Sequence, residues 1–123
     1  PLVARNTTRD TLVAGRVAAG GTFWTSFRGL MGRATIDPDE GLWLPGDGAI
    51  HMFFMRFAID CAFLGPSAPD GSRPVVSLRH GLRPWTGMAW ARGAGGVLEL
   101  ASGALARSAT ELGDRIALTE AET

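Results

Sequence analysis

Short apolar runs alternate with turn-forming residues along most of the chain. Glycine, proline, asparagine and aspartate break up these runs, and short apolar or alternating stretches between such breaks are typical of β-strands. The pattern therefore predicts many short strands joined by tight turns rather than long helices. We expect about eight strands, at residues 2–5, 12–17, 42–44, 50–55, 57–64, 75–78, 97–100 and 115–119.

One segment has the spacing of an amphipathic helix. Phe23, Phe27 and Leu30 recur at intervals that place them on one helical face. Thr22 precedes them and is a candidate N-cap, because its hydroxyl can accept a hydrogen bond from the first turn. The predicted helical segments are one short helix near residues 22–31 and a single turn that Ser102 caps and that runs through Ala109.

The most apolar stretch of the chain is residues 50–64, which we expect to be buried on both faces or nearly so. Side chains alternate between the faces of a strand. One face then carries Phe57, Ile59, Cys61 and Phe63, and the other carries Arg56, Ala58, Asp60 and Ala62. Small residues beside charges leave room above the sheet, as in the floor of a binding pocket, where Arg56 could clamp an anion. The alternative is a partly buried ion pair between Arg56 and Asp60 that fixes the strand register.

The composition fits a single, mainly β domain that spans residues 1–123. Hydrophobic residues make up 46% and charged residues 20% of the 123 residues, which is ordinary for one globular domain and too apolar for disorder. The 17 glycines and 7 prolines make 24 residues, or about a fifth of the chain against roughly 12% in average usage. This excess agrees with many tight turns.

The charge of the chain limits the classes of partner that it can attract. The formal net charge is zero, which argues against electrostatic capture of nucleic acid or of an anionic membrane. All twelve basic residues are arginine, which suits bidentate recognition of anions, although a biased genome is the better explanation. No apolar stretch reaches the roughly 18 residues of a membrane helix, and no secretory signal is visible. We expect a cytoplasmic location, although the first residue is proline, which is compatible with a removed leader.

Several motifs occur in an order that is typical of a known family. They are Arg28-Gly-Leu-Met-Gly-Arg33, Asp39-Glu-Gly-Leu42, His51, Met55-Arg-Phe-Ala-Ile-Asp60, Arg83-Pro-Trp85, Val97-Leu-Glu-Leu100 and Leu112-Gly-Asp114. With these motifs the chain resembles domain-of-unknown-function family 192, also called UPF0127, over roughly residues 27–118. Ala58 stands where many members have proline. The resemblance implies a β-sandwich or barrel of jelly-roll-like character with a small helix packed on it, and it implies no established activity.

Charged residues set in apolar elements of such a fold should meet in space, because buried charges are costly unless they are paired. We expect a pocket that is edged by Trp85 and lined by Arg33, His51, Arg56, Asp60 and Arg83. Glu99 either faces the same site or points to solvent, and Asp114 is predicted to be a turn residue. A pocket rich in arginine without an evident base or nucleophile favours binding over reaction. The predicted function is a small binding module for a small anionic or sugar-like ligand or a peptide terminus.

Two enzymatic alternatives stay open. A hydrolase could use His51 with Asp60 or Cys61, which requires a histidine nitrogen within hydrogen-bond reach of the carboxylate or thiol. Acid–base chemistry by Asp60 and Glu99 requires the two carboxylates at a defined separation. Cys61 lies in an apolar run, where a thiol behaves as a small hydrophobe.

A third function class is an interaction protein. It would expose an apolar patch around Trp85, Met88 and Trp90. The chain has two histidines and one cysteine without ligand spacing. We therefore expect no metal or other cofactor. From the zero net charge we expect no nucleic-acid or membrane partner.

Overall fold

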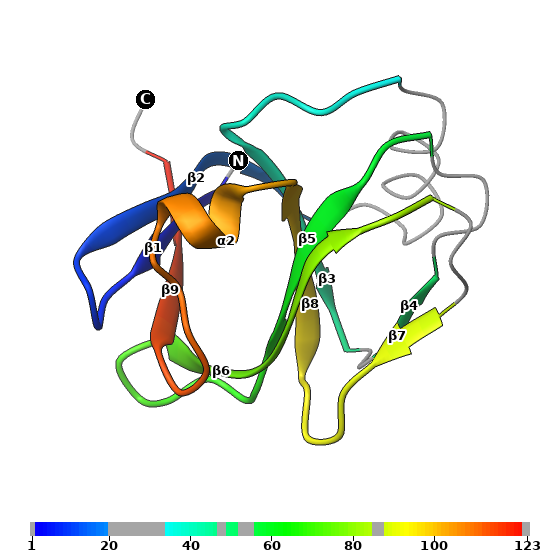
Figure 1. Cartoon of the computed structure of the whole chain (residues 1–123). Helices are drawn as coiled ribbons and strands as arrows, with labels where there is room; N and C mark the ends of the chain where they lie inside the picture. The colour runs from blue at the N-terminus through cyan, green and yellow to red at the C-terminus, as the bar shows by residue number, and fades with distance from the viewer. Residues whose placement is uncertain (1, 20–33, 47–48, 52–55, 85–87, 122–123) are drawn as a thin grey trace.

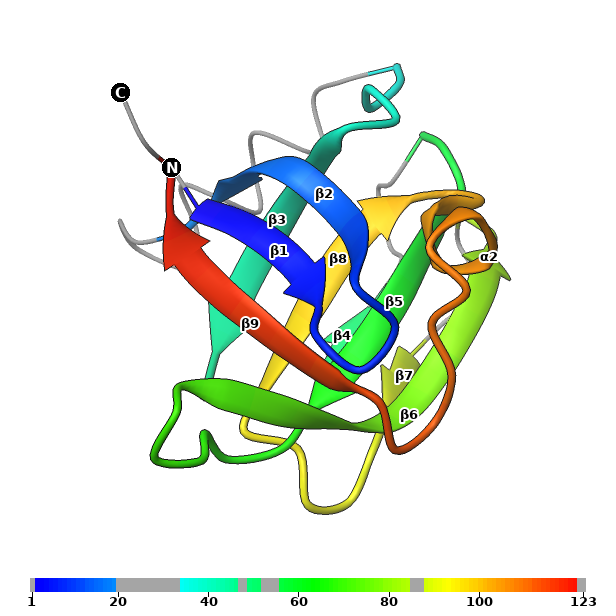
Figure 2. The ribbon, with the colours of Figure 1, turned by 90° about the vertical axis from the view of Figure 1, so that its left-hand side faces the viewer.

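Seven strands close into a barrel (Figures 1 and 2). They are β1 (Leu2–Asn6), β2 (Thr11–Ala18), β3 (Glu40–Pro45), β5 (Ile59–Leu64), β6 (Ser72–Leu82), β8 (Gly96–Ala101) and β9 (Arg115–Glu120). Their order around the barrel is β1-β2-β3-β8-β5-β6-β9, and β9 closes onto β1. The β2–β3 pair is parallel and the other pairs are antiparallel. The structure is a computed structural model that describes residues 2–19, 34–46, 49–51, 56–84 and 88–121.

Two smaller elements complete the described fold. The strands β4 (Ala49–His51) and β7 (Met88–Trp90) form a separate two-stranded antiparallel sheet outside the barrel (Figure 1). The short helix α2 (Ala104–Arg107) covers one end of the barrel, and its Ala104 and Leu105 pack in the barrel interior. No helix within the described ranges is long and apolar enough to cross a membrane.

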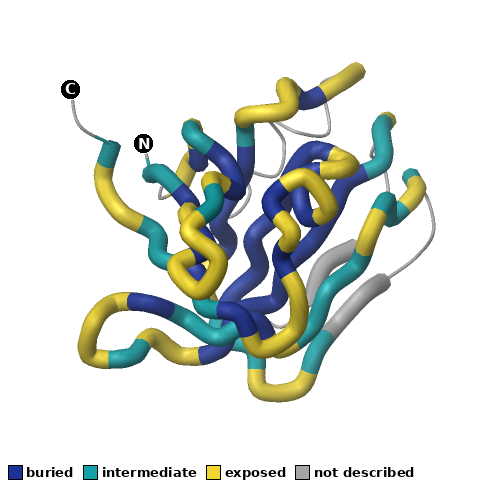
Figure 3. Tube along the Cα trace, turned by 60° about the vertical axis from the view of Figure 1, so that its left-hand side comes forward, coloured by how far each residue is buried: buried dark blue, intermediate teal, exposed yellow. Residues whose placement is uncertain are grey.

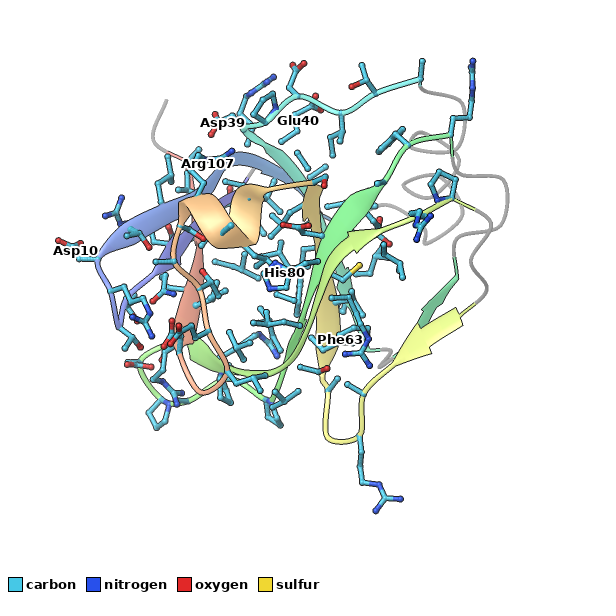
Figure 4. All side chains as sticks on the ribbon, in the orientation of Figure 1. Asp10, Asp39, Glu40, Phe63, His80 and Arg107 are labelled. Carbon is cyan, nitrogen blue, oxygen red and sulfur yellow. The ribbon has the colours of Figure 1, made fainter. Side chains whose placement is uncertain are left out.

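The barrel wall is buried on both sides along β5 and β8 (Figure 3). The interior cluster includes Val13, Val17, Trp43, Ala62, Leu64, Leu98, Leu100, Leu105 and Ile116. We call the opposite side of β3, β8, β5 and β6 the outer face; its buried apolar residues are Leu42, Leu44, Ile59, Cys61, Phe63, Val97 and Ala101. Continuous apolar runs are what strands buried on both sides require. Figure 4 shows Phe63 on the side of β5 that faces β4 and β7.

Sequence patterns predicted this architecture well. The mainly β, single-domain barrel or sandwich is confirmed, and the apolar segment 59–64 is buried on both faces as expected. The predicted helix near 22–31 and residues 52–55 of a predicted strand lie outside the described residues. Strand β6 is longer than predicted, because Ser72–Pro74 pair with β9 and the rest pairs with β5.

Two local predictions were wrong. Strand β7 lies in a glycine-rich stretch that has no strand-like alternation, so its pairing with β4 overrides the local pattern. The N-cap of α2 is Gly103 rather than Ser102, and no side chain of the cap residue bonds the first turn. Gly103 has φ +97°, a left-handed conformation that favours glycine. The cap is supplied by a distant strand, because Asp60 accepts the hydrogen bonds of the Gly103 and Leu105 amides.

Gly96 leaves room for the ring of Trp43 in the barrel interior. A Cβ at this position would overlap Trp43 Cη2 and lie 2.6 Å from Cζ2. We expect Gly96→Ala to lower the free energy of unfolding by about 1–3 kcal/mol through overpacking, measured by urea denaturation.

The neighbouring Gly95→Ala is the matched control for that change. Its nearest added contact is 3.3 Å from Arg73 Nη1, the end of a long side chain that can move. A loss in Gly95→Ala as large as in Gly96→Ala, or a Gly96→Ala loss undiminished in a Trp43→Phe background, would contradict the overlap with Trp43.

Candidate functional site

Asp60 lies inside the barrel near the end that α2 covers. Its Oδ1 accepts a hydrogen bond from the Gly81 amide at 2.8 Å. Its Oδ2 accepts from the amides of Gly103 at 3.1 Å and Leu105 at 3.0 Å. The residue is 1% exposed. The carboxylate thus ties the end of β6 and the start of α2 to β5, which is a structural role.

The strand face that carries Asp60 and Ala62 turns toward the barrel interior. Ala62 has no exposed surface and packs in the interior cluster with Leu98 and Leu100. The room that the small alanine suggested is filled by core side chains. The interpretation of this face as the floor of a pocket is therefore wrong at Ala62.

Arg56 and Arg83 lie at one end of the β5–β6 pair. Ile59 pairs with Leu82; Arg56 precedes Ile59 by three residues and Arg83 follows Leu82 directly. Three residues span at most about 11 Å, so the two arginines belong to the same end of the barrel wall. Both are exposed.

Among the ion pairs of the described residues none joins Arg56 to Asp60, so the alternative of a structural pair is wrong.

The other predicted site residues are placed only in part. His51 ends β4, and Arg33 and Trp85 lie outside the described residues. The convergence of these residues with the two exposed arginines stays a prediction. Met88 and Trp90 belong to β7, and the interaction patch that they were expected to form with Trp85 also stays a prediction.

Glu99 lies on the outer face and is buried there. It pairs with Leu42 on one side and with Cys61 on the other, and it is 1% exposed. Neither carboxyl oxygen has a hydrogen-bond partner among the described residues. Burial raises the pKa of Glu99 to about 8, because a low-dielectric environment disfavours the charged form. The expectation that Glu99 could point to solvent is wrong.

Glu99 and Asp60 occupy opposite faces of the sheet. Glu99 is opposite Cys61 in the register, whereas Asp60 is opposite Leu100, an interior residue. The barrel wall itself separates the two carboxyl groups. They do not form an acid–base pair around a common substrate.

Cys61 is a poor candidate for a nucleophile. It has no exposed surface, and burial, followed by the charge of Glu99, raises the pKa of its thiol well above the usual value. Reactive cysteines have a lowered pKa in an accessible, electropositive setting. The thiol behaves as part of the apolar outer face, as its sequence neighbours predicted.

Arg79 is a charged neighbour of this face that sequence analysis did not single out. It lies opposite Cys61 on β6, because a register shift between Ile59 and Cys61 brings it there. Its Nη1 donates to Ser77 Oγ at 2.7 Å and to the Leu78 carbonyl at 2.9 Å. Its guanidinium carbon lies 5.8 Å from the centre of the Phe63 ring. No feature of the sequence indicates such a register shift.

A second polar cluster, around Asp114, is structural. Asp114 Oδ2 accepts hydrogen bonds from Arg9, Asn6 and the Glu111 amide. Burial alone would raise the pKa of Asp114, but the bonds from Arg9 and Asn6 outweigh it and lower the pKa. The Asp114 amide also donates to the Glu111 carbonyl, which confirms the predicted turn. Across the described ranges no group of three or more potential metal ligands comes together.

Known proteins share both the sequence pattern and the fold of this chain. Residues 4–118 match the model of family DUF192, described as Uncharacterized ACR. A UPF0127 protein of Thermococcus sibiricus is 36% identical over 115 residues, which are 90% of this chain and 71% of the relative.

Two crystal structures have a similar fold. One is a protein of unknown function from Novosphingobium aromaticivorans, with a TM-score of 0.69, 24% identity, and coverage of 94% of this chain and 82% of the other. The second is a Sinorhizobium meliloti protein proposed to be a transcription regulator, with a TM-score of 0.70, 21% identity, and coverage of 95% and 91%. At these identities the likeness shows the fold alone. The family model and the 36% identical relative together show that this chain belongs to the UPF0127 family, domain-of-unknown-function family 192.

Proposed function

We propose that this protein is a small ligand-binding module in which Arg56 and Arg83 hold the anionic group of the ligand. The observation that carries the proposal is the Ile59–Leu82 pairing, which brings two exposed arginines to one end of the β5–β6 pair. A guanidinium group offers paired donors that match a carboxylate or phosphate. Arg33, His51 and Trp85 extend the proposed site.

The ligand class that best fits these arginines is a small carboxylate or phosphate, and a peptide C-terminus belongs to the same class. A neutral sugar would gain less from two cations than an anion would. Binding is favoured over the hydrolase alternative because the two groups that this alternative assigns as partners of His51, Asp60 and Cys61, are unsuited to the reaction. Asp60 accepts three backbone hydrogen bonds, and Cys61 is buried with a raised pKa.

The test is thermal unfolding in the presence of acetate, succinate, inorganic phosphate and glucose. We expect at least one of the anions to raise the Tm of the wild type, and glucose to have no effect. A ligand at about 100 times its Kd stabilises the folded state by about 2.7 kcal/mol. Arg56→Ala should remove this stabilisation. Both arginines are exposed, so the variant should fold, since exposed substitutions usually change stability by only about 0.5 kcal/mol.

Arg92→Ala is the matched control, because Arg92 is also exposed and lies in the turn between β7 and β8. It removes the same charge at a different place. The proposal fails if no anion stabilises the wild type. It also fails if Arg56→Ala and Arg92→Ala reduce the stabilisation equally.

A further inference from the structure

Glu99 is an exception among the buried polar residues. The described part of the chain buries seven polar or charged residues: Asn6, Asp60, Ser72, Glu99, Ser108, Thr110 and Asp114. Six of them have side-chain hydrogen bonds, and Glu99 has none within that part. A buried polar group without a partner is rare in folded proteins and calls for a specific explanation.

No described residue directly beside Glu99 carries a positive charge. Burial is the cause of its raised pKa, and among the described residues no cation offsets that cost of ionisation. Arg79, two strands away on the same face, directs its guanidinium to Ser77, Leu78 and the Phe63 ring. The residues directly beside Glu99 are Leu42 and Cys61, and neither donates a hydrogen bond to it.

We propose that Glu99 anchors the ammonium group of a primary amine whose body is otherwise apolar, in a site on the outer face of β3, β8 and β5. A cation supplies a positive charge beside the carboxylate, and the apolar body matches Leu42, Val97 and Ala101 around the carboxyl group. A divalent metal fits less well, because it needs several oxygen ligands and the described residues bring no such group together.

The β4–β7 sheet shares no strand pairing with the barrel among the described residues. The β4–β7 sheet is hydrogen-bonded within itself and belongs to a different sheet from the barrel strands. Phe57, Leu82, Ala91 and Ala94 pack against the outer-face cluster as partly buried residues. A ligand that enters between this sheet and the outer face therefore breaks no hydrogen bond of the barrel wall.

Calorimetric titration of the whole chain with benzylamine, and with benzyl alcohol as its neutral counterpart, tests the proposal. We expect benzylamine to bind the wild type at least about tenfold more tightly than benzyl alcohol does. Glu99→Gln should weaken amine binding by about tenfold or more and leave alcohol binding unchanged. Glu111→Gln is the matched control, because Glu111 is exposed.

A second measurement covers the case in which Glu99→Gln does not fold. Glu99 is mostly protonated at neutral pH, so binding of an ammonium ion must release its proton to the buffer. The titratable or charged described groups near Glu99 on the packed strands are Cys61 on β5 and Arg79 on β6. Titration of the wild type in buffers of different ionisation enthalpy should show nearly one proton released for each amine bound.

Equal affinity for the amine and the alcohol, or amine binding without proton release, would overturn the proposal. Absence of amine binding would overturn it as well. The outcome is separable from that for the arginine site. Arg56→Ala should leave benzylamine binding unchanged, whereas it removes the response to anions.

Discussion

Raising the pH from about 5 to about 9 is expected to destabilise the wild type by about 3–4 kcal/mol relative to Glu99→Gln. The pKa of Glu99 is about 8 in the folded protein, against a usual value of 4.5. Between these values the folded state holds a proton that the unfolded state has lost. Stability therefore falls as the pH rises, by about 1.4 kcal/mol per pH unit. It levels off once the pH exceeds the folded pKa.

The quantity to measure is the difference in unfolding free energy between the wild type and Glu99→Gln, obtained from urea denaturation at each pH. Glutamine keeps the size of the side chain but has no proton to lose in this range. Groups shared by both proteins cancel in the difference. Because the pKa of Cys61 is raised in the folded protein, its thiol stays protonated there over this pH range.

Glu111→Gln provides the reference, because it removes an exposed carboxylate that pairs with Arg9 at the surface. Its difference from the wild type should stay flat over the same range. A flat difference for Glu99→Gln too would mean that Glu99 is already ionised in the folded protein at about pH 5. The outer face would then hold a partner for the carboxylate.

Asp60→Asn is expected to lower the free energy of unfolding by about 3–5 kcal/mol. The carboxylate serves donors on both of its oxygens: Gly81 on one, and Gly103 with Leu105 on the other. An amide has one oxygen, and its NH2 group must face the donors of one side. Each buried donor left without an acceptor costs about 1–3 kcal/mol. The remaining bonds weaken as well, because a charged acceptor binds about twice as strongly as a neutral one.

Asp39→Asn is the matched control for this change. Asp39 also accepts a hydrogen bond from a backbone amide of another element, Gly15, but it is exposed. We expect it to lose less than about 1 kcal/mol. Hydrogen exchange should show faster exchange in α2 of Asp60→Asn, since Asp60 holds its first turn. Equal losses in the two variants would show that the three bonds of Asp60 contribute little.

Most of the barrel could be predicted because its strands are marked locally. The continuous apolar run that includes β5 and the turn residues between strands indicate a sheet buried on both sides. The order of strands could not be read in the same way, because pairing of β3 with β8 or of β1 with β9 joins distant segments. Strand β7 lacked a local pattern altogether, since its partner β4 determines it.

The candidate site was less predictable, because its properties depend on which side of the barrel wall each residue faces. Alternation correctly separated Asp60 from Cys61, yet both sides proved to be buried. As a carboxylate, Asp60 was a good candidate for a functional residue. Its two oxygens instead accept hydrogen bonds from backbone amides of β6 and of the start of α2. Glu99 drew attention as a charge within an apolar strand. Its lack of a partner depends on the neighbouring strands, which no local pattern reveals.

The contact between β1 and β9 has a consequence for biosynthesis. Each residue of β1 from Leu2 to Asn6 pairs with β9, from Glu120 back to Ile116, so the strands lie side by side (Figure 2). During translation β1 is synthesised 110 residues before β9 begins to form its pairs (Asn6 against Ile116), so β1 has no second neighbour until then. An unpaired strand edge is prone to pair with another chain. A nascent chain that stalls before β9 should therefore be the form of this protein most prone to aggregate and most in need of a chaperone.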